Sequence, residues 1–194
     1  MGLTPHIWID YGISPQIILP IIIQGIDNLS RLLYLGDMEQ ISNLQLGQIY
    51  LVSKHNTFDL TIDLALTTGI RLLVCGNRLP FYDLAYALAG LVGQHYETVL
   101  RQQIFFSRAE TCTQLVDFLS EMAVDPTPLL ITDLLARFND EDDAQVDELF
   151  FACQVELKRL CKETFVFVSA TPHPPLERLG YVLQRITHVL DIEG

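Results

Sequence analysis

Residues 47–76 read GQIYLVSKHNTFDLTIDLALTTGIRLLVCG and contain two short apolar runs on either side of a helical pattern. The runs, Gln48–Val52 and Ile70–Cys75, have the length and the β-branched content of buried strands. Between them, the spacing of apolar residues predicts a helix over Leu60–Thr68. A strand, a helix and a strand in this order predict one crossover unit of a parallel sheet.

The same alternation continues downstream of this unit. Helical spacing predicts further helices over Phe81–Val92, Leu115–Met122, Val146–Leu160 and Leu176–Thr187. Short apolar runs predict further strands over Gln103–Phe106, Leu129–Thr132, Thr164–Ser169 and His188–Ile192. Ser107 and Glu110 have capping-box spacing and are expected to open the helix before Leu115.

Upstream, Ile17–Ile23 is expected to form a strand, and residues 26–36 a helix. Residues 1–16 show no periodicity and are expected to form an irregular arm. We therefore predict a single domain over residues 1–194, of three-layer α/β class, with a mainly parallel sheet covered by helices on both faces.

Composition supports a sheet that is buried on both sides. Of 194 residues, 49% are apolar and only 19% are charged. The net charge of −12 repels phosphate backbones, so nucleic acid is not an expected direct partner. The apolar run at 17–23 is interrupted by Pro20 and is too short to span a bilayer. We expect a cytoplasmic protein without a signal peptide or a membrane segment.

The histidines and cysteines show no metal-binding pattern. The five histidines are scattered, and the four cysteines lack C-x-x-C or zinc-finger spacing, so no metal site is expected. Cys153 and Cys161 lie on the apolar face of one helix, which predicts core residues rather than nucleophiles.

Four segments resemble the RecA-type recombinase core, a branch of the P-loop ATPases. They read GIDNLSRLL at 25–33, LGQIYLV at 46–52, QIFFSRAETCTQL at 103–115 and LLITD at 129–133. The likeness covers roughly residues 20–190 and implies a RecA-like P-loop NTPase fold. It also implies that Asp133 stands where the Walker B aspartate contacts magnesium through water.

The phosphate loop of that family is degenerate here. A working loop reads G-x-x-x-x-G-K-[ST], in which glycines let backbone N–H groups wrap the phosphates and the lysine neutralises them. Ser53 and Phe58 stand at the glycine positions, Asp59 at the lysine position and Leu60 at the hydroxyl position. The phenylalanine is expected to block the approach to the backbone, and the carboxylate to repel a triphosphate.

Other catalytic elements that the resemblance implies are also missing. Asn77 stands where the catalytic glutamate should follow the second core strand, and an amide cannot take a proton from water. The family's sensor glutamine is absent near Ala170 and Thr171. Only Asp133 remains, and an aspartate at the end of a strand can also cap a neighbouring loop. We therefore expect neither an enzyme nor a cofactor, with ATP and magnesium not expected to bind.

The regions that contact DNA in recombinases have also changed. After Asp133 the sequence runs NDEDD at 139–143, and four carboxylates there oppose phosphate binding. The same run could be the solvated start of a helix or the docking site of a basic partner. After Ser169, residues 171–175 read TPHPP, which is short and stiff.

These features predict a non-catalytic RecA-like pseudo-ATPase, acting as an accessory or regulatory protein-interaction subunit in DNA recombination or repair. The expected partner is a protein, either an active RecA-like paralogue or a second copy. One alternative is a nucleotide- or anion-sensing module that uses Lys54, Arg78 and Asp133 without hydrolysis. A DNA-binding recombination mediator is a second alternative, which the net charge disfavours.

Overall fold

The structure is a computed structural model that describes residues 44–76, 81–140, 143–171, 174 and 176–190. The arm over 1–16, the strand expected over Ile17–Ile23 and the helix after it lie outside the described residues. Asn77 and Arg78 lie outside them as well.

A six-stranded sheet forms the centre of the described chain, in the order β3-β2-β4-β5-β1-β6. Every neighbouring pair in this sheet is parallel. The strands are β1 (Ile49–Val52), β2 (Ile70–Val74), β3 (Ile104–Arg108), β4 (Leu129–Thr132), β5 (Val166–Val168) and β6 (His188–Leu190). The expected three-layer α/β class with a parallel sheet is confirmed.

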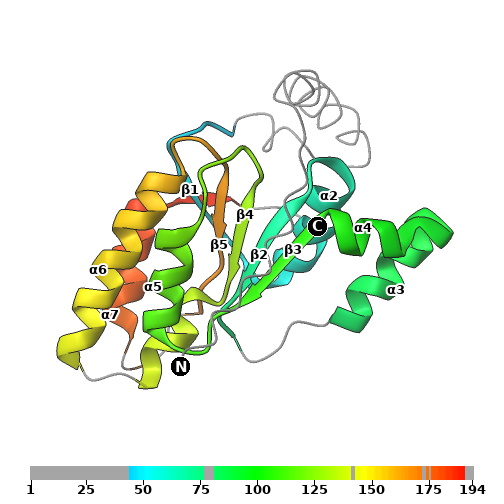
Figure 1. Ribbon diagram of the computed structural model, residues 1–194. Helices are drawn as coiled ribbons and strands as arrows, with labels where there is room; N and C mark the ends of the chain where they lie inside the picture. Colours follow the sequence, from blue (N-terminus) through cyan, green and yellow to red (C-terminus); the bar gives the residue numbers. More distant parts are fainter. Residues whose placement is uncertain (1–43, 77–80, 141–142, 172–173, 175, 191–194) are drawn as a thin grey trace, which may run out of the picture.

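Helices cover both faces of the sheet (Figure 1). One face carries α2 (Thr57–Thr67), α3 (Phe81–Val92) and α4 (Tyr96–Gln102). The other face carries α5 (Cys112–Glu121), α6 (Asp143–Leu160) and α7 (Glu177–Ile186). Right-handed crossovers require this division, because the chain moves out to β3 through the first three helices and returns through the other three. Three short 3-10 segments complete the described elements: η2 (Lys54–Asn56), η3 (Gly93–His95) and η4 (Leu134–Asp140).

The central strands supply alternate residues to two separate cores. Leu73 and Ile131 pack toward α5, α6 and α7. Leu72 and Leu130 pack toward α2, α3 and α4. Successive side chains of a strand point to opposite faces, so a strand between two helix layers must be apolar at every position. This requirement explains the unbroken apolar runs in the sequence.

Three local predictions were wrong or incomplete. Helix α4 was not predicted, because only a few apolar positions of this seven-residue segment mark a helical stripe. Helix α2 begins at Thr57, three residues before the predicted start. The predicted capping box at Ser107 is wrong, because Ser107 belongs to β3, where it lies opposite Leu73 of β2. Thr111 caps α5 instead, and its Oγ1 accepts a hydrogen bond from the Gln114 N–H at 3.2 Å.

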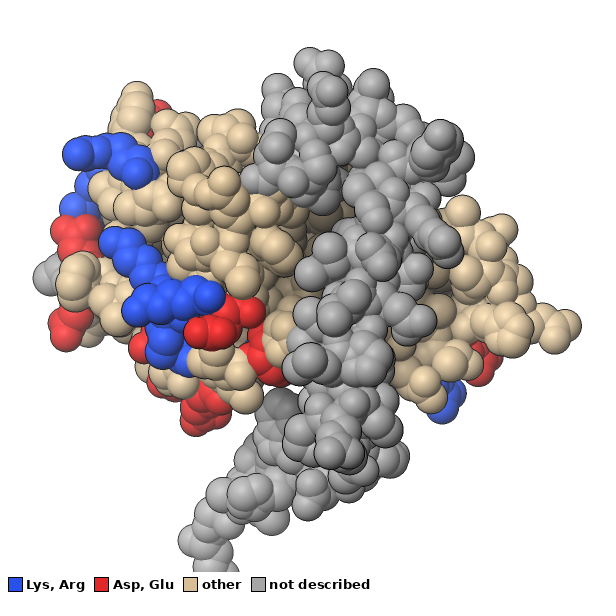
Figure 2. All heavy atoms as spheres, turned by 90° about the horizontal axis from the view of Figure 1, so that it is seen from above, with Lys and Arg blue, Asp and Glu red and all other residues tan. Residues whose placement is uncertain are grey.

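Charge is unevenly distributed around the described part of the molecule. Viewed along the strands from their amino ends, charged side chains gather over the end that α5, α6 and α7 form (Figure 2). The opposite end, formed by α3 and α4, shows few charged side chains in this view. None of the helices in the described ranges is both long and apolar enough to cross a membrane.

Candidate functional site

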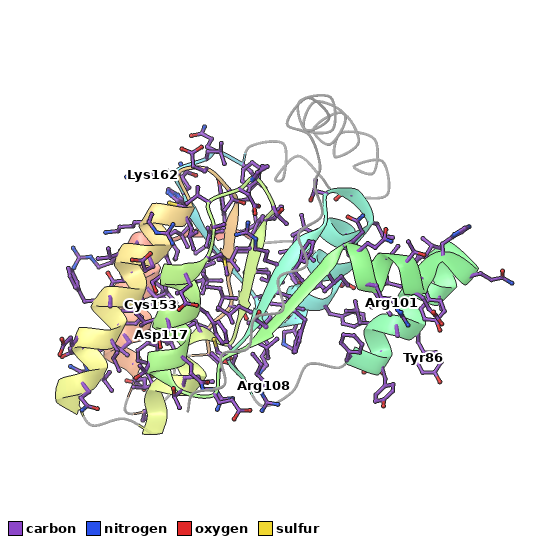
Figure 3. All side chains as sticks on the ribbon, in the orientation of Figure 1. Tyr86, Arg101, Arg108, Asp117, Cys153 and Lys162 are labelled. Carbon is purple, nitrogen blue, oxygen red and sulfur yellow. The ribbon has the colours of Figure 1, made fainter. Side chains whose placement is uncertain are left out.

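The candidate site lies at the carboxyl ends of the strands, where β1, β2, β4 and β5 release their loops. After β1 the chain enters α2 on one face, and after the neighbouring β5 it enters α7 on the other face. The neighbours β2 and β4 diverge in the same way, toward α3 and α6. In open α/β sheets, ligands bind at such points of divergence. Figure 3 shows Arg108, the last residue of β3, at this edge of the sheet.

The loop after β1 carries the degenerate phosphate-loop residues. Ser53 is exposed, and η2 then leads without a break into α2. The Thr57 hydroxyl donates a hydrogen bond of 2.8 Å to the Lys54 carbonyl, which fixes the start of the helix. The segment from Ser53 to Leu60 contains no glycine, so it lacks the residues that let a phosphate loop wrap its backbone N–H groups around an anion.

The side chains that follow in α2 have different surroundings. Phe58 is half-buried and packs against the core beneath α2, α3 and α4. The ring thus contributes to the core, and the expectation that it blocks the approach to the loop stays a prediction. Leu60 is fully buried in the same core. Asp59 is exposed in the first turn of α2, where a carboxylate is favoured by the helix dipole.

Lys54 and Asp133 meet across this edge of the sheet. The Lys54 Nζ lies 3.3 Å from Asp133 Oδ2. The lysine side chain is 65% exposed, whereas that of the aspartate is only 22% exposed. The amine therefore remains open to solvent while its charge is paired with the carboxylate.

Asp133 is held by the loop after β5. Its backbone has φ 57, in the left-handed region that Asp tolerates better than most residues. The Asp133 N–H donates to the buried Ser169 Oγ at 2.9 Å, and the Leu134 N–H donates to the Ser169 carbonyl at 2.8 Å. The backbone of Asp133 is thus tied to the loop after β5.

Gly76 and Arg137 connect the remaining loops. A Cβ added at Gly76 would lie 3.0 Å from Asp133 Oδ2, so glycine lets the two loops approach without displacing the aspartate side chain. Arg137 Nη2 donates to the Gly76 carbonyl at 3.2 Å. Cys112 Sγ donates to the Arg137 carbonyl at 2.9 Å. Together these contacts join the segments that follow β2, β3 and β4.

Cys75 lies directly behind this cluster and is fully buried. Burial raises the pKa of its thiol to about 12, opposed by Arg137 and reinforced by Asp133 and Cys112. The thiol therefore stays protonated at neutral pH and is a poor nucleophile. Burial also raises the pKa of Cys153 and of Cys161, and both lie in the core, as the sequence predicted.

The structure brings together only part of the predicted site. Lys54 and Asp133 are in contact, whereas Arg78 falls outside the described residues. The sequence did not identify Ser169 or Arg137 as part of the site. Their positions in the sequence could have indicated them, since Ser169 directly follows β5 and Arg137 lies four residues after Asp133.

The available chemistry is that of a paired lysine and carboxylate. Within the described ranges, no three His, Cys, Asp or Glu side chains are grouped so that they could hold a metal ion. The acidic run ends at Asp143, where α6 begins.

Comparison with known proteins adds no assignment. No protein-family model matches the sequence, and no curated protein matches it. The resemblance to RecA-type recombinases therefore rests on the residues themselves.

Proposed function

We propose that this protein is a non-catalytic RecA-like pseudo-ATPase that acts as an accessory or regulatory protein-interaction subunit. The observation that supports this proposal is the 3.3 Å pairing of Lys54 with Asp133 beside a loop without glycine. In a P-loop ATPase, the lysine faces the phosphates and the aspartate faces magnesium. Here a lysine and an aspartate, Lys54 and Asp133, instead neutralise each other.

Electrostatics disfavour a triphosphate at this place. A phosphate charge about 4 Å from a carboxylate is opposed by on the order of 1–4 kcal/mol near a protein surface. Asp133 and Asp59 both contribute carboxylates around the loop after β1. Without glycines, the loop is not expected to wrap its backbone N–H groups around the phosphates and so to compensate for this repulsion.

The proposed role is in DNA recombination or repair, which the resemblance of four ordered segments suggests. The partner is a protein, either an active RecA-like paralogue or a second copy of this chain. The net charge of −12 argues against direct contact with nucleic acid.

Isothermal titration of the full chain with ATP and magnesium tests the proposal. We expect no saturable heat up to millimolar nucleotide, and no release of phosphate above the blank. Stoichiometric binding, or turnover that Asp133→Ala abolishes, would contradict the non-catalytic role. Lys54→Met is the matched variant, because it removes the amine that pairs with Asp133 and leaves the backbone at Asp133 unchanged.

Anion sensing is a second candidate, supported by the solvent exposure of the Lys54 amine at the carboxyl edge. An anion that displaces Asp133 from this amine would stabilise the folded chain according to its concentration and affinity. This candidate predicts a rise in melting temperature with millimolar ATP or inorganic phosphate, absent in Lys54→Met. An unchanged melting temperature of the wild-type chain would exclude it.

A further inference from the structure

Helix α3 is mostly apolar on its exposed side as well as on its buried side. Its sequence, FYDLAYALAGLV, contains a single charged residue, Asp83. Leu84 and Leu88 are buried in the core that α3 shares with α2 and α4, as expected for the inner face. A surface helix usually carries charged residues on its outer face, and one that is apolar all round is usually covered on both sides.

The outer face of α3 is nevertheless exposed in the described structure. Tyr82 is 83% exposed and Tyr86 is 78% exposed. These two residues lie four positions apart, so they stand side by side on the helix. Figure 3 shows Tyr86 extending away from the sheet.

The same face changes from large to small residues along the helix. Gly90, four positions after Tyr86, is exposed, and a Cβ added there would meet no atom within 4 Å. Ala89 is next to it and only partly buried. The first half of the face therefore presents two tyrosine rings, and the second half presents a glycine with open space above it.

Aromatic exposure extends from α3 to the edge strand β3. The rings of Phe81 and Phe106 lie 6.3 Å apart in an edge-to-face arrangement, and both are exposed. An aromatic side chain has about 150–250 Å² of surface to bury. With Tyr82 and Tyr86, these residues supply on the order of 500 Å², which is most of the roughly 800 Å² that each partner buries in a standard interface.

We propose that this surface, the α3 face formed by Tyr82, Tyr86, Ala89 and Gly90 with the adjoining Phe81 and Phe106, binds a second copy of the chain. Two α3 helices packed antiparallel about a two-fold axis near Tyr86 place Tyr82 of each copy over Gly90 of the other. The face is thus self-complementary, as a two-fold interface must be. The small residue allows the helices to approach closely in ridges-into-grooves packing.

Charge favours this position for self-association. Each chain carries a net charge of −12, so two copies repel each other unless they meet through a surface of low charge. Helix α3 carries fewer charged residues than any other α-helix of the described ranges, Asp83 alone. Added salt screens the remaining repulsion, so the dimer is expected to tighten as the salt concentration rises. The binding of a basic partner would instead weaken as the salt concentration rises.

This inference rests on the proposed role as a protein-interaction subunit and specifies its partner. Sedimentation equilibrium of the full chain from 1 to 100 µM tests it, at 50 mM and at 500 mM sodium chloride. We expect a monomer–dimer equilibrium of the 22.0 kDa chain that is tighter at the higher salt concentration.

Substitutions on the face test its position. Tyr86→Glu and Gly90→Gln are each expected to raise the dimer dissociation constant at least 30-fold, because central interface residues contribute most of the affinity and each change acts in both copies. Gly90→Gln is the essential variant, since glutamine favours a helix more than glycine and leaves the monomer folded. Tyr181→Glu on α7, on the opposite face of the sheet, is the control and should leave the dimer unchanged.

A chain that remains monomeric at 100 µM in both salts would overturn the inference. A dimer unaffected by Gly90→Gln, or one weakened by salt, would overturn the assignment to this face. These outcomes are separable from the proposed lack of catalysis, because nucleotide titration is read independently of the oligomeric state.

Discussion

Replacing Asp133 tests whether this residue is required for its backbone conformation or for its charge. Its φ of 57 places it in the left-handed region, which costs an ordinary residue with a Cβ about 1–2 kcal/mol. Asn tolerates that region nearly as well as Asp, whereas Ala does not. We therefore expect Asp133→Ala to lower the free energy of unfolding by about 1–2 kcal/mol more than Asp133→Asn does.

The ion pair with Lys54 is expected to contribute less. The lysine side chain is 65% exposed, so solvent screens the 3.3 Å contact to Asp133 Oδ2. Exposed pairs of this kind contribute about 0.2–1 kcal/mol. A double-mutant cycle that combines Lys54→Met with Asp133→Asn should return a coupling energy in that range. The coupling should fall further in 0.5 M salt.

Urea denaturation at pH 7 measures both quantities, provided that the variants share one m value. If Asp133→Ala were no more destabilising than Asp133→Asn, the backbone explanation would be refuted. A coupling energy above about 2 kcal/mol that persists in high salt would show that the pair is not screened, contrary to its exposure.

Four further predictions concern stability. Gly69→Ala should lower the free energy of unfolding by about 1–2 kcal/mol, since Gly69 has φ 78 and an added Cβ would lie 3.2 Å from a backbone carbonyl oxygen. Gly90→Ala, in open space within a helix, should raise it by up to about 1 kcal/mol, as urea denaturation of dilute protein can measure. Leu157→Ala in the core should cost about 2–5 kcal/mol, whereas the exposed Phe151→Ala should cost little by the same assay. Above pH 9 the free energy of unfolding of the wild type should fall toward pH 12, because the thiol of Cys75 ionises at a lower pH in the unfolded chain than in the folded one. Urea titrations at several pH values should show a smaller fall for Cys75→Ala.

Secondary structure was predictable where a local pattern was complete. Helix α3 and strand β4 have the predicted bounds, since their patterns end at Pro, Gly or polar residues. The cap of α5 was misplaced because Ser107 and Thr111 both fit a local capping pattern. Pairing of β3 with β2 through Ser107 and Arg108 decided between them, and that pairing is not local information.

The candidate site was predictable only as separate residues. Asp133 was identified because it follows an apolar strand, and Lys54 because it follows another. Their contact joins residues 79 positions apart, and the support from Ser169 spans a further 36 positions. Nothing in the local pattern around either residue indicates these partners.

By itself, the sequence determined that this chain forms a parallel α/β sheet between two helix layers. Helical periodicity indicates a helix buried on one side, and an unbroken apolar run indicates a strand buried on both faces. Strands buried on both faces are typical of a parallel sheet between two helix layers. Only the tertiary structure decided that Lys54 pairs with Asp133 and that the outer face of α3 stays uncovered. Both depend on the order of strands in the sheet and on the direction of each crossover, because these set which distant residues meet and which apolar surfaces find no cover within the described chain.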